Sequence, residues 1–213
     1  MFGESYAKFY DGFNSDKNYE KEIKFVYEWA GRPGSIFDIG CGTASYWKFY
    51  PERTKLFGIE KSRSMHSSSD RIKNADIMTY THKGNRFDCA TALFDVLNYI
   101  PRHDWWKNLP IKKGGFFIFD IWDKEKVQQD GFRITERKSG DAKRLIAPLI
   151  FDGKKIDLMI NVVLEKTSEI FYETHTMYLY SREEIEKFCG KEFEVCDYMR
   201  TKTWQTWVKC RRK

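Results

Sequence analysis

Residues 36–44, with the sequence Ile-Phe-Asp-Ile-Gly-Cys-Gly-Thr-Ala, join a carboxylate to a turn that contains two glycines. Gly40 and Gly42 allow a sharp reversal of the chain and a close approach of backbone N–H groups to a ligand. Asp38, just before them, would repel a phosphate, so the turn suits a ligand with a cationic amine and no phosphate. An ordinary strand-to-helix turn is the alternative interpretation.

Further side chains that could bind or react follow the ends of other predicted strands. Glu60 ends the apolar run 56–59, about twenty residues after the glycine turn, where an acidic residue accepts ribose hydroxyls in nucleotide-binding folds. The ligands of open parallel sheets bind outside the carboxyl ends of the strands. The same kind of position is predicted for Asp76, Phe94, Asp95, Asp120 and Trp122. We therefore expect one ligand site along this edge of a sheet.

Periodic apolar residues predict the elements that position these groups. Tyr6, Phe9, Tyr10 and Phe13 follow a near-helical spacing, and 18–30 has the pattern of an amphipathic helix. Further helices are expected at 43–50, 62–70 and 101–108, strands at 56–59, 87–93 and 116–119, and a turn at 112–115.

Between residues 131 and 180 the pattern changes to alternating polar and apolar side chains. Strands predicted at 133–138, 144–151, 155–165 and 169–180, with an Asp152-Gly153 turn, are typical of an antiparallel meander. A helix at 182–189 and strands at 192–198 and 204–210 follow. We expect a single α/β domain made of an N-terminal lid and helix (1–34), a ligand-binding core (35–130), the meander (131–180) and the last helix and strands (181–213).

The composition limits the class of protein. The 213 residues suffice for one α/β domain with a full core, and the basic residues behind the net charge of +6 are scattered among 31 acidic ones. We therefore expect no nucleic-acid partner. The five cysteines form no C-x-x-C pair, which indicates reduced thiols in a cytoplasmic protein. No run reaches the length of a membrane helix, and no apolar signal segment begins the sequence, so we expect no membrane partner.

The glycine turn resembles the first motif of the class I S-adenosylmethionine (SAM)-dependent methyltransferases, which runs apolar-apolar-Asp-apolar-Gly-Cys-Gly-Thr-Gly. Only Ala44 departs from that motif. The resemblance covers residues 35–122 and implies a Rossmann-like, seven-stranded sheet whose last strand is antiparallel, with SAM as the cofactor. It also implies that Asp38 helps to hold the amino-acid end of SAM, Glu60 the ribose, and Asp76 with Ile77 the adenine. The cofactor-binding residues that we predict are Tyr19, Asp38, Gly40, Cys41, Gly42, Glu60, Lys61, Asp76, Ile77 and Phe94.

The meander, together with Tyr10-Asp11, Asp120-Ile121-Trp122 and Glu173-Thr174-His175, looks like the small-molecule branch that includes sugar N-methyltransferases and glycan methyltransferases. This likeness implies that the acceptor is a sugar hydroxyl of a glycan or nucleotide-sugar, with the amine of an amino sugar as the alternative. A hydroxyl needs a positioned base, for which His175, Asp120 and Asp95 are the candidates, and Tyr10 would lie near the methyl group as part of the lid. The predicted acceptor-binding residues are Tyr6, Tyr10, Tyr99, Trp122 and His175.

Other functions stay open as alternatives. A dinucleotide oxidoreductase would need phosphate-binding donors where Asp38 stands. An RNA methyltransferase would need a broad basic face, whereas the meander mixes its lysines with Asp152 and Asp157. A SAM-binding module without activity would share the first motif. Asp95 and Asp120 lack the further ligands that a divalent cation takes, so we expect no metal site.

Overall fold

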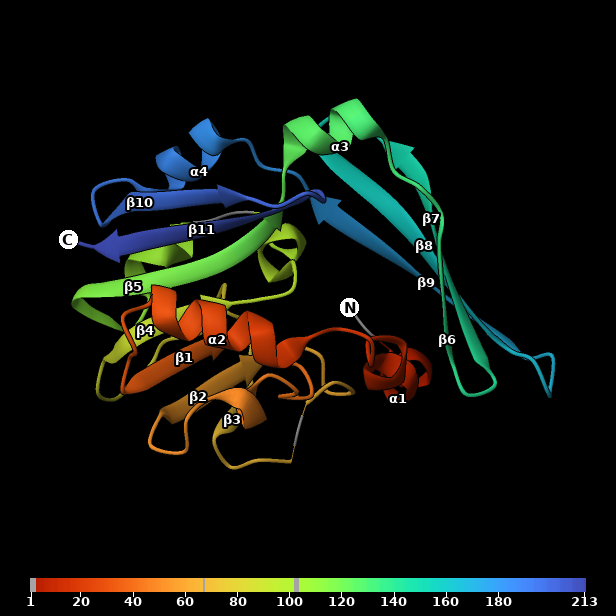
Figure 1. Cartoon of the computed structure of the whole chain (residues 1–213), viewed down its shortest axis with the longest axis horizontal. Helices are drawn as coiled ribbons and strands as arrows, with labels where there is room; N and C mark the ends of the chain where they lie inside the picture. The colour runs from red at the N-terminus through yellow and green to blue at the C-terminus, as the bar shows by residue number, and fades with distance from the viewer. Residues whose placement is uncertain (1–2, 67, 102–103) are drawn as a thin grey trace.

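The computed structural model describes residues 3–66, 68–101 and 104–213, which form two β-sheets (Figure 1). The large sheet has seven strands in the order β10-β11-β5-β4-β1-β2-β3, and the small sheet has four in the order β6-β7-β8-β9. In Figure 1 the small sheet stands at a steep angle beyond one end of the large sheet, with helix α1 (Glu4–Phe13) near its base. The predicted fold class, a seven-stranded α/β sheet with an added antiparallel meander, is confirmed.

Five strands of the large sheet run parallel to one another. They are β1 (Ser35–Ile39), β2 (Lys55–Glu60), β3 (Ile72–Asn74), β4 (Phe87–Ala92) and β5 (Ile111–Trp122). β11 (Gln205–Arg212) pairs antiparallel with both β5 and β10 (Phe193–Arg200), so the prediction of an antiparallel last strand is confirmed. Because β1 is central, both of its faces are covered, and the whole of 36–39 is buried.

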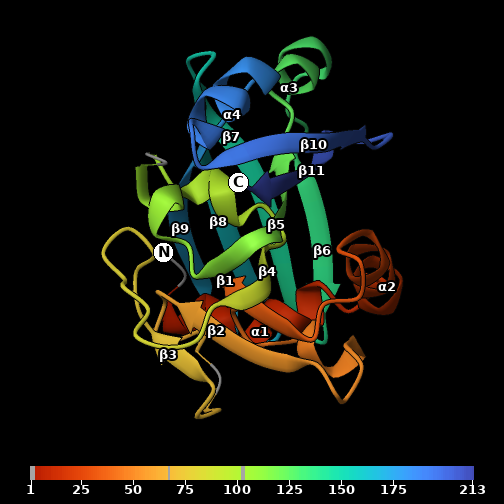
Figure 2. The same cartoon turned by 90° about the vertical axis from the view of Figure 1, so that its left-hand side faces the viewer.

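Two hydrophobic layers cover the large sheet. Helix α2 (Tyr19–Trp29) begins at Asn18, whose side chain accepts from the Lys21 amide, and its buried stripe includes Ile23 and Val26. The other layer contains the 3-10 helices η2 (Val96–Tyr99) and η3 (Asp104–Asn108) and helix α4 (Arg182–Cys189), around the buried Trp106. Figure 2 shows α2 on one side of the sheet and the yellow-green segments on the other. The predicted helices at 18–30 and 182–189 are confirmed.

The helices predicted at 43–50 and 62–70 are wrong. Only a 3-10 turn, η1 (Trp47–Phe49), forms in the first of them, because Ala44 has a φ of +61°, which interrupts a right-handed helix. In the second, the described residues form turns, such as the bond from the Met65 amide to the Ser62 carbonyl. At 101–108 only η3 forms within the described residues, and 102–103 lie outside them.

The predicted turn at 112–115 is also wrong, because these residues lie within β5. They form an irregularity in its pairing with β4, where the register shifts between Phe87 and Cys89 and Gly114 takes a φ of +78°. β5 therefore begins five residues before the predicted strand and runs without a break to Trp122, at the predicted site.

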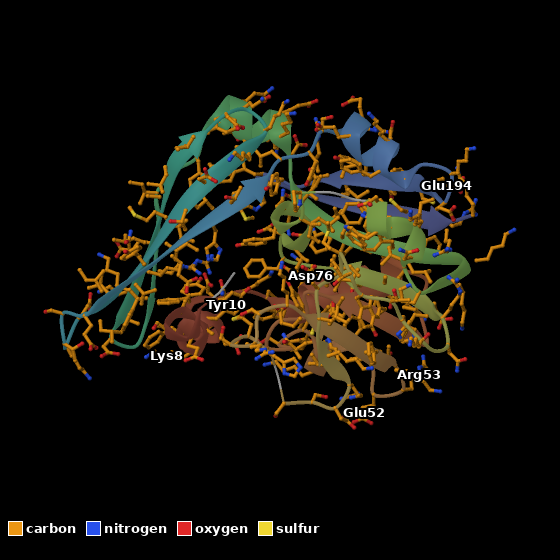
Figure 3. All side chains as sticks on the ribbon, turned by 180° about the vertical axis from the view of Figure 1, so that it is seen from behind. Lys8, Tyr10, Glu52, Arg53, Asp76 and Glu194 are labelled. Atoms are coloured by element: carbon orange, nitrogen blue, oxygen red, sulfur yellow. The ribbon has the colours of Figure 1, made fainter. Side chains whose placement is uncertain are left out.

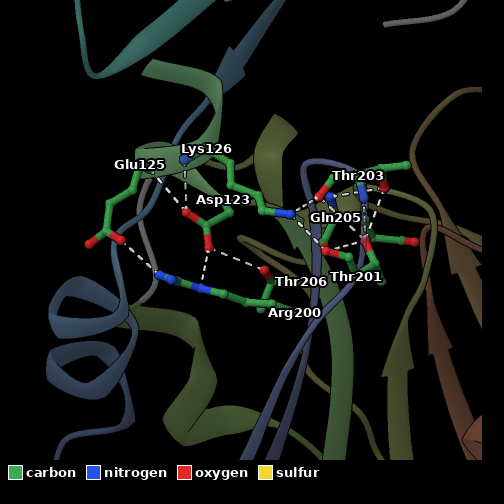
Figure 4. A network of polar contacts seen from close by, with 8 residues as sticks. All are labelled: Asp123, Glu125, Lys126, Arg200, Thr201, Thr203, Gln205 and Thr206. Atoms are coloured by element: carbon green, nitrogen blue, oxygen red, sulfur yellow. Dashed lines mark hydrogen bonds and ion pairs between the residues drawn. The ribbon is translucent and has the colours of Figure 1, made fainter. Parts of the chain in front are cut away.

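Helix α3 (Lys124–Asp130) was not predicted, although Asp123 is a good cap for it. The Asp123 carboxylate accepts from the Glu125 and Lys126 amides and forms an ion pair of 2.9 Å with Arg200 of β10 (Figure 4). The Lys126 ammonium donates to the Thr201 and Thr203 carbonyls in the turn before β11. This network joins the end of β5 to the β10–β11 hairpin.

The small sheet consists of β6 (Thr135–Ser139), β7 (Ala142–Phe151), β8 (Lys155–Leu164) and β9 (Ile170–Tyr178), all antiparallel. Its inner face is apolar, since Ile156, Leu158, Ile160 and Val162 alternate with less buried residues along β8. Tyr6 and Phe13 of α1 pack on this face. The predicted meander is confirmed, with strand ends within a few residues of those expected.

Four of the five cysteines, Cys41, Cys89, Cys189 and Cys210, are buried as free thiols, and Cys196 is exposed. The Cys189 and Cys210 sulfurs lie 3.5 Å apart, where α4 packs on β11. In the described part of the chain, no helix is both long enough and apolar enough to cross a membrane.

Candidate active site

A cavity of about 470 Å³ lies at the carboxyl ends of β1, β2 and β4, between the large sheet, the inner face of the small sheet and α1. Its volume lies within the range of small-molecule sites, about 300–1,000 Å³. The predicted site residues that line it are Tyr6, Tyr10, Tyr19, Gly40, Cys41, Gly42, Glu60, Lys61, Asp76, Ile77, Phe94, Asp95, Tyr99 and Trp122. Three other predicted site residues, Asp38, Asp120 and His175, do not line the cavity. The predicted site is therefore one continuous space with three of its residues placed behind the wall.

The glycine turn forms the floor of this cavity. Gly40 has a φ of +64°, and a Cβ atom there would lie 2.7 Å from the Val96 side chain, so only glycine fits. The amides of Gly40 and Cys41 donate to the Ile59 carbonyl, and the Gly42 amide donates to the Glu60 carboxylate at 3.0 Å. The N–H groups of the turn are therefore bonded within the protein.

Glu60 projects from the end of β2 into the cavity. Its Oε1 accepts from the Ser62 amide at 2.7 Å and its Oε2 from the Gly42 amide. Burial raises the pKa of Glu60, and these backbone hydrogen bonds act in the opposite direction by favouring the charged form. Each carboxylate oxygen keeps lone pairs for one more donor. The side chain is therefore oriented by backbone groups and can accept two ligand hydroxyls.

Asp38 lies beneath the glycine turn. Its Oδ1 accepts from the Thr91 hydroxyl at 2.7 Å and its Oδ2 from the Trp47 indole at 2.8 Å, and the residue is 4% exposed. Burial raises the pKa of Asp38 to about 6, against the effect of these two hydrogen bonds. Asp38 thus ties β1 to β4 and to η1, and supports the turn from below.

Asp76 and Lys61 form the far wall, beyond Glu60. The Asp76 carboxylate accepts from the Met78 amide at 2.9 Å and forms an ion pair of 2.8 Å with the Lys61 ammonium. Ile77 provides an apolar surface next to them. Figure 3 shows Asp76 beside the large sheet and Tyr10 on α1, both on the side of the molecule where the two sheets face each other.

The segment after β4 has a backbone that is rare for its residues. Phe94 and Asp95 have φ values of +69° and +62°, a conformation that costs about 1–3 kcal/mol for each non-glycine residue and is concentrated at functional sites. The buried Asp120 carboxylate holds this backbone segment by accepting from the Phe94 amide at 2.6 Å and the Asp95 amide at 3.2 Å. It also accepts from the Gln205 side chain at 2.8 Å. Asp120 is therefore positioned to shape this wall.

Asp95 itself faces the cavity beside Asp120. Burial, and next the negative charge of Asp120, raise the pKa of Asp95 well above its usual range, while the Trp122 indole hydrogen-bonds to it. The neutral form of Asp95 is thereby favoured. Within residues 3–66, 68–101 and 104–213, no group of three or more His, Cys, Asp or Glu side chains could hold a metal ion.

A chain of three side chains reaches from the cavity into the small sheet. The Tyr99 hydroxyl lies 3.1 Å from His175 Nδ1, and His175 Nε2 lies 2.9 Å from Glu173 Oε2. The other Glu173 oxygen accepts from the Gly3 amide at 2.8 Å. Burial lowers the pKa of His175 and raises that of Tyr99. Tyr99 lines the cavity, and His175, 2% exposed, lies behind it.

Aromatic side chains close the cavity from α1 and α2. Burial raises the pKa of Tyr10 well above its usual range and that of Tyr19 to about 12, so both hydroxyls stay neutral. The Tyr10 ring lies 6.2 Å from the Phe94 ring, edge to face. The Lys17 ammonium lies 3.4 Å from the centre of the Phe94 ring. π faces and hydroxyls thus surround the middle of the cavity.

The small sheet also contributes to the cavity wall, which was not predicted from the sequence. Arg137, Arg144, Ile146 and Met177 all line it. A signal was present in the sequence, because Arg144 lies two residues after Ala142 and two before Ile146, and such a period of two places it on the apolar face.

Comparison with known proteins supports the fold. No protein-family model and no curated protein matches the sequence. Among solved structures, a SAM-dependent methyltransferase from Clostridium acetobutylicum ATCC 824 is 21% identical, covers 98% of each chain and has a TM-score of 0.80.

Two further similar structures are of sugar-modifying enzymes. CalS10, an amino pentose methyltransferase from Micromonospora echinaspora solved with SAM bound, is 17% identical over 100% of this chain and 98% of that one, with a TM-score of 0.74. The sugar N-methyltransferase KedS8 from Streptoalloteichus sp. ATCC 53650 is 18% identical over 100% and 95%, with a TM-score of 0.75. The chain therefore has the fold of the SAM-dependent methyltransferases.

Proposed function

We propose that this protein is a SAM-dependent methyltransferase whose acceptor is a small molecule. The observation that carries the proposal is that a single cavity contains both Glu60 and Asp76, at the ends of β2 and β3, and Tyr99, which is bonded to His175. Glu60 and Asp76 suit the binding of a nucleoside, and Tyr99 suits a proton transfer. The fold shared with SAM-dependent methyltransferases supports this assignment.

The residues present fit SAM better than a dinucleotide. A pyrophosphate needs free N–H groups at the glycine turn, but the amides of 40–42 donate to Ile59 and Glu60. Glu60 would accept the ribose hydroxyls, and Asp76 with Ile77 would hold the adenine. Phe94, which faces the same cavity, would offer a π face to the sulfonium. SAM supplies the methyl group and leaves as S-adenosylhomocysteine (SAH).

The chain of Tyr99, His175 and Glu173 would remove the proton from the acceptor. If His175 donates its Nε2–H to Glu173, its Nδ1 accepts the Tyr99 proton as the Tyr99 oxygen takes the proton of an acceptor hydroxyl. The Glu173 carboxylate would then stabilise the imidazolium. The lowered pKa of His175 favours the neutral imidazole, which is the form that can accept a proton. In this proposal His175 is the base, as predicted, but it acts through Tyr99.

The other predicted catalytic groups take different roles in this proposal. Asp120 is a positioning residue, since its oxygens hold the amides of 94 and 95. Asp95, favoured in its neutral form, would contribute a hydrogen bond rather than a negative charge. Tyr10, on α1, would cover the methyl group as part of a lid.

We propose a sugar-like hydroxyl as the acceptor group, because the relay serves an atom that must lose its proton to become nucleophilic. An amine is the second candidate, favoured by the likeness to an amino pentose methyltransferase and a sugar N-methyltransferase. An amine that is already neutral attacks without a base and loses its proton afterwards.

Two measurements test the function. Calorimetric titration should show binding of SAH, and binding of NAD without SAH would refute the assignment. Transfer of a labelled methyl group from SAM should then be measured with neutral sugars, amino sugars and bulk RNA, each with and without EDTA. Turnover that is confined to RNA would reject a small-molecule acceptor, and turnover that is confined to amino sugars would select the amine.

A further inference from the structure

Arg144 is a buried cation in the wall of the cavity, at its small-sheet end. It is 7% exposed, and its guanidinium donates to the Tyr6 hydroxyl at 2.8 Å and lies 5.3 Å from the centre of the Phe13 ring. Its Nε atom is buried without a hydrogen-bond partner in the described part of the chain. Neither Tyr6 nor Phe13 carries a negative charge at neutral pH, since burial raises the pKa of Tyr6 further.

A second arginine increases the positive charge at this place. Arg137 of β6 is the direct cross-strand partner of Arg144 on β7, and both line the cavity. Like charges directly opposite each other destabilise a sheet. Arg137 forms an ion pair with Asp16, whose side chain is 70% exposed, whereas Arg144 has no ion pair within the described residues.

The acidic side chain of the small sheet that faces the same way, Glu173, already has partners for both of its oxygens. Glu173, on the same inner face, bonds to His175 with one oxygen and to the Gly3 amide with the other. A buried charge without an oppositely charged partner is unfavourable. An anionic group on a ligand in the cavity would supply that partner. An arginine fork matches the two oxygens of a carboxylate or of a phosphate.

We propose that Arg144, with Arg137, forms a subsite for an oxyanion of the acceptor, that is, a carboxylate or a phosphate group attached to the molecule that is methylated. The inference rests on the proposed function, because it places this group in the same cavity as Tyr99. The acceptor is thereby anionic, and its negative group is held on the small sheet while its reacting atom lies at the large sheet. Neutral sugars lack this contact.

The test uses glucose, glucuronate and glucose 1-phosphate as probes, titrated calorimetrically into the full chain saturated with SAH. Arg144→Gln removes the fork. Lys143→Gln is the matched control, since it removes one positive charge from the adjacent residue of β7, whose side chain bonds to Glu136 on β6. We expect at least one anionic probe to bind about tenfold or more tightly than glucose, and Arg144→Gln to abolish this preference while Lys143→Gln keeps it.

The outcomes separate the subsite from the proposed function. If SAH binds but the anionic probes bind no better than glucose, or bind equally to Arg144→Gln and Lys143→Gln, the subsite is refuted and the methyltransferase proposal stands. If SAH fails to bind the wild-type chain, the proposed function is refuted, and Arg144-dependent binding of an anion would still support the subsite. Should Arg144→Gln lose SAH binding through unfolding, Arg144→Lys, which keeps the charge but not the fork, replaces it and should weaken the anionic probe's binding. The two anionic probes distinguish a carboxylate from a phosphate.

Discussion

Removal of the Glu60 carboxylate should weaken cofactor binding. Each Glu60 oxygen already accepts one backbone amide, from Ser62 or Gly42, which leaves one acceptor position on each for a ribose hydroxyl. Two hydrogen bonds to a charged, partly buried carboxylate contribute about 2–3 kcal/mol after the loss of their hydration. Glu60→Ala should therefore raise the dissociation constant of SAH by about 30- to 150-fold.

Glu60→Gln provides a variant of the same size. Its amide group has one acceptor oxygen and one donor nitrogen, so the nitrogen must face the N–H of either Gly42 or Ser62. We expect it to bind SAH more weakly than the wild type as well. Binding should also weaken as the pH falls through the raised pKa of Glu60, because the protonated form offers fewer acceptors.

The assay is calorimetric titration with SAH at neutral pH, with thermal unfolding measured in parallel to show that each variant is folded. Glu52→Ala is the control, since Glu52 is exposed and Figure 3 shows it at the outer edge of the molecule, away from Asp76. A folded Glu60→Ala protein that binds SAH within about threefold of the wild type would refute the reasoning and place the ribose elsewhere.

Three other predictions concern catalysis, pH and stability. Tyr99→Phe and His175→Ala should each lower kcat for a hydroxyl acceptor by about 10²- to 10⁴-fold with SAH affinity unchanged, and a full rate in either would remove the relay. The free energy of unfolding should fall by about 3 kcal/mol as the pH rises from 4 to above 6, because the folded state raises the pKa of Asp38 to about 6 and so disfavours its charged form. In urea titrations, Asp38→Asn should lack this pH dependence. Asp120→Ala leaves three donors without their acceptor and should cost about 2–4 kcal/mol in urea unfolding, and a loss below about 0.5 kcal/mol would contradict its positioning role.

Local patterns in the sequence determined most of the secondary structure. The meander was predictable because alternation with a period of two and the Asp152-Gly153 turn are properties of neighbouring residues. α4 was predictable from Ser181 and Glu184, which form a capping box in the structure. The position of Glu60 and Asp76 on the cavity wall followed from one rule, that ligands bind at the carboxyl ends of parallel strands.

Only the tertiary structure decided which side chains face the cavity and which support it. Asp38 and Asp120 follow the same strand-end rule as Glu60, yet their oxygens are taken by donors from other strands and loops, such as Thr91 and Gln205. His175 lies behind Tyr99 because β9 packs against η2, a contact between residues 76 positions apart. Arg144 faces the cavity because the small sheet turns its inner face toward α1 and the large sheet. Such placements depend on contacts between segments that are distant in the sequence. A local pattern of polar and apolar residues does not determine these contacts, so the placements are visible only in the packed structure.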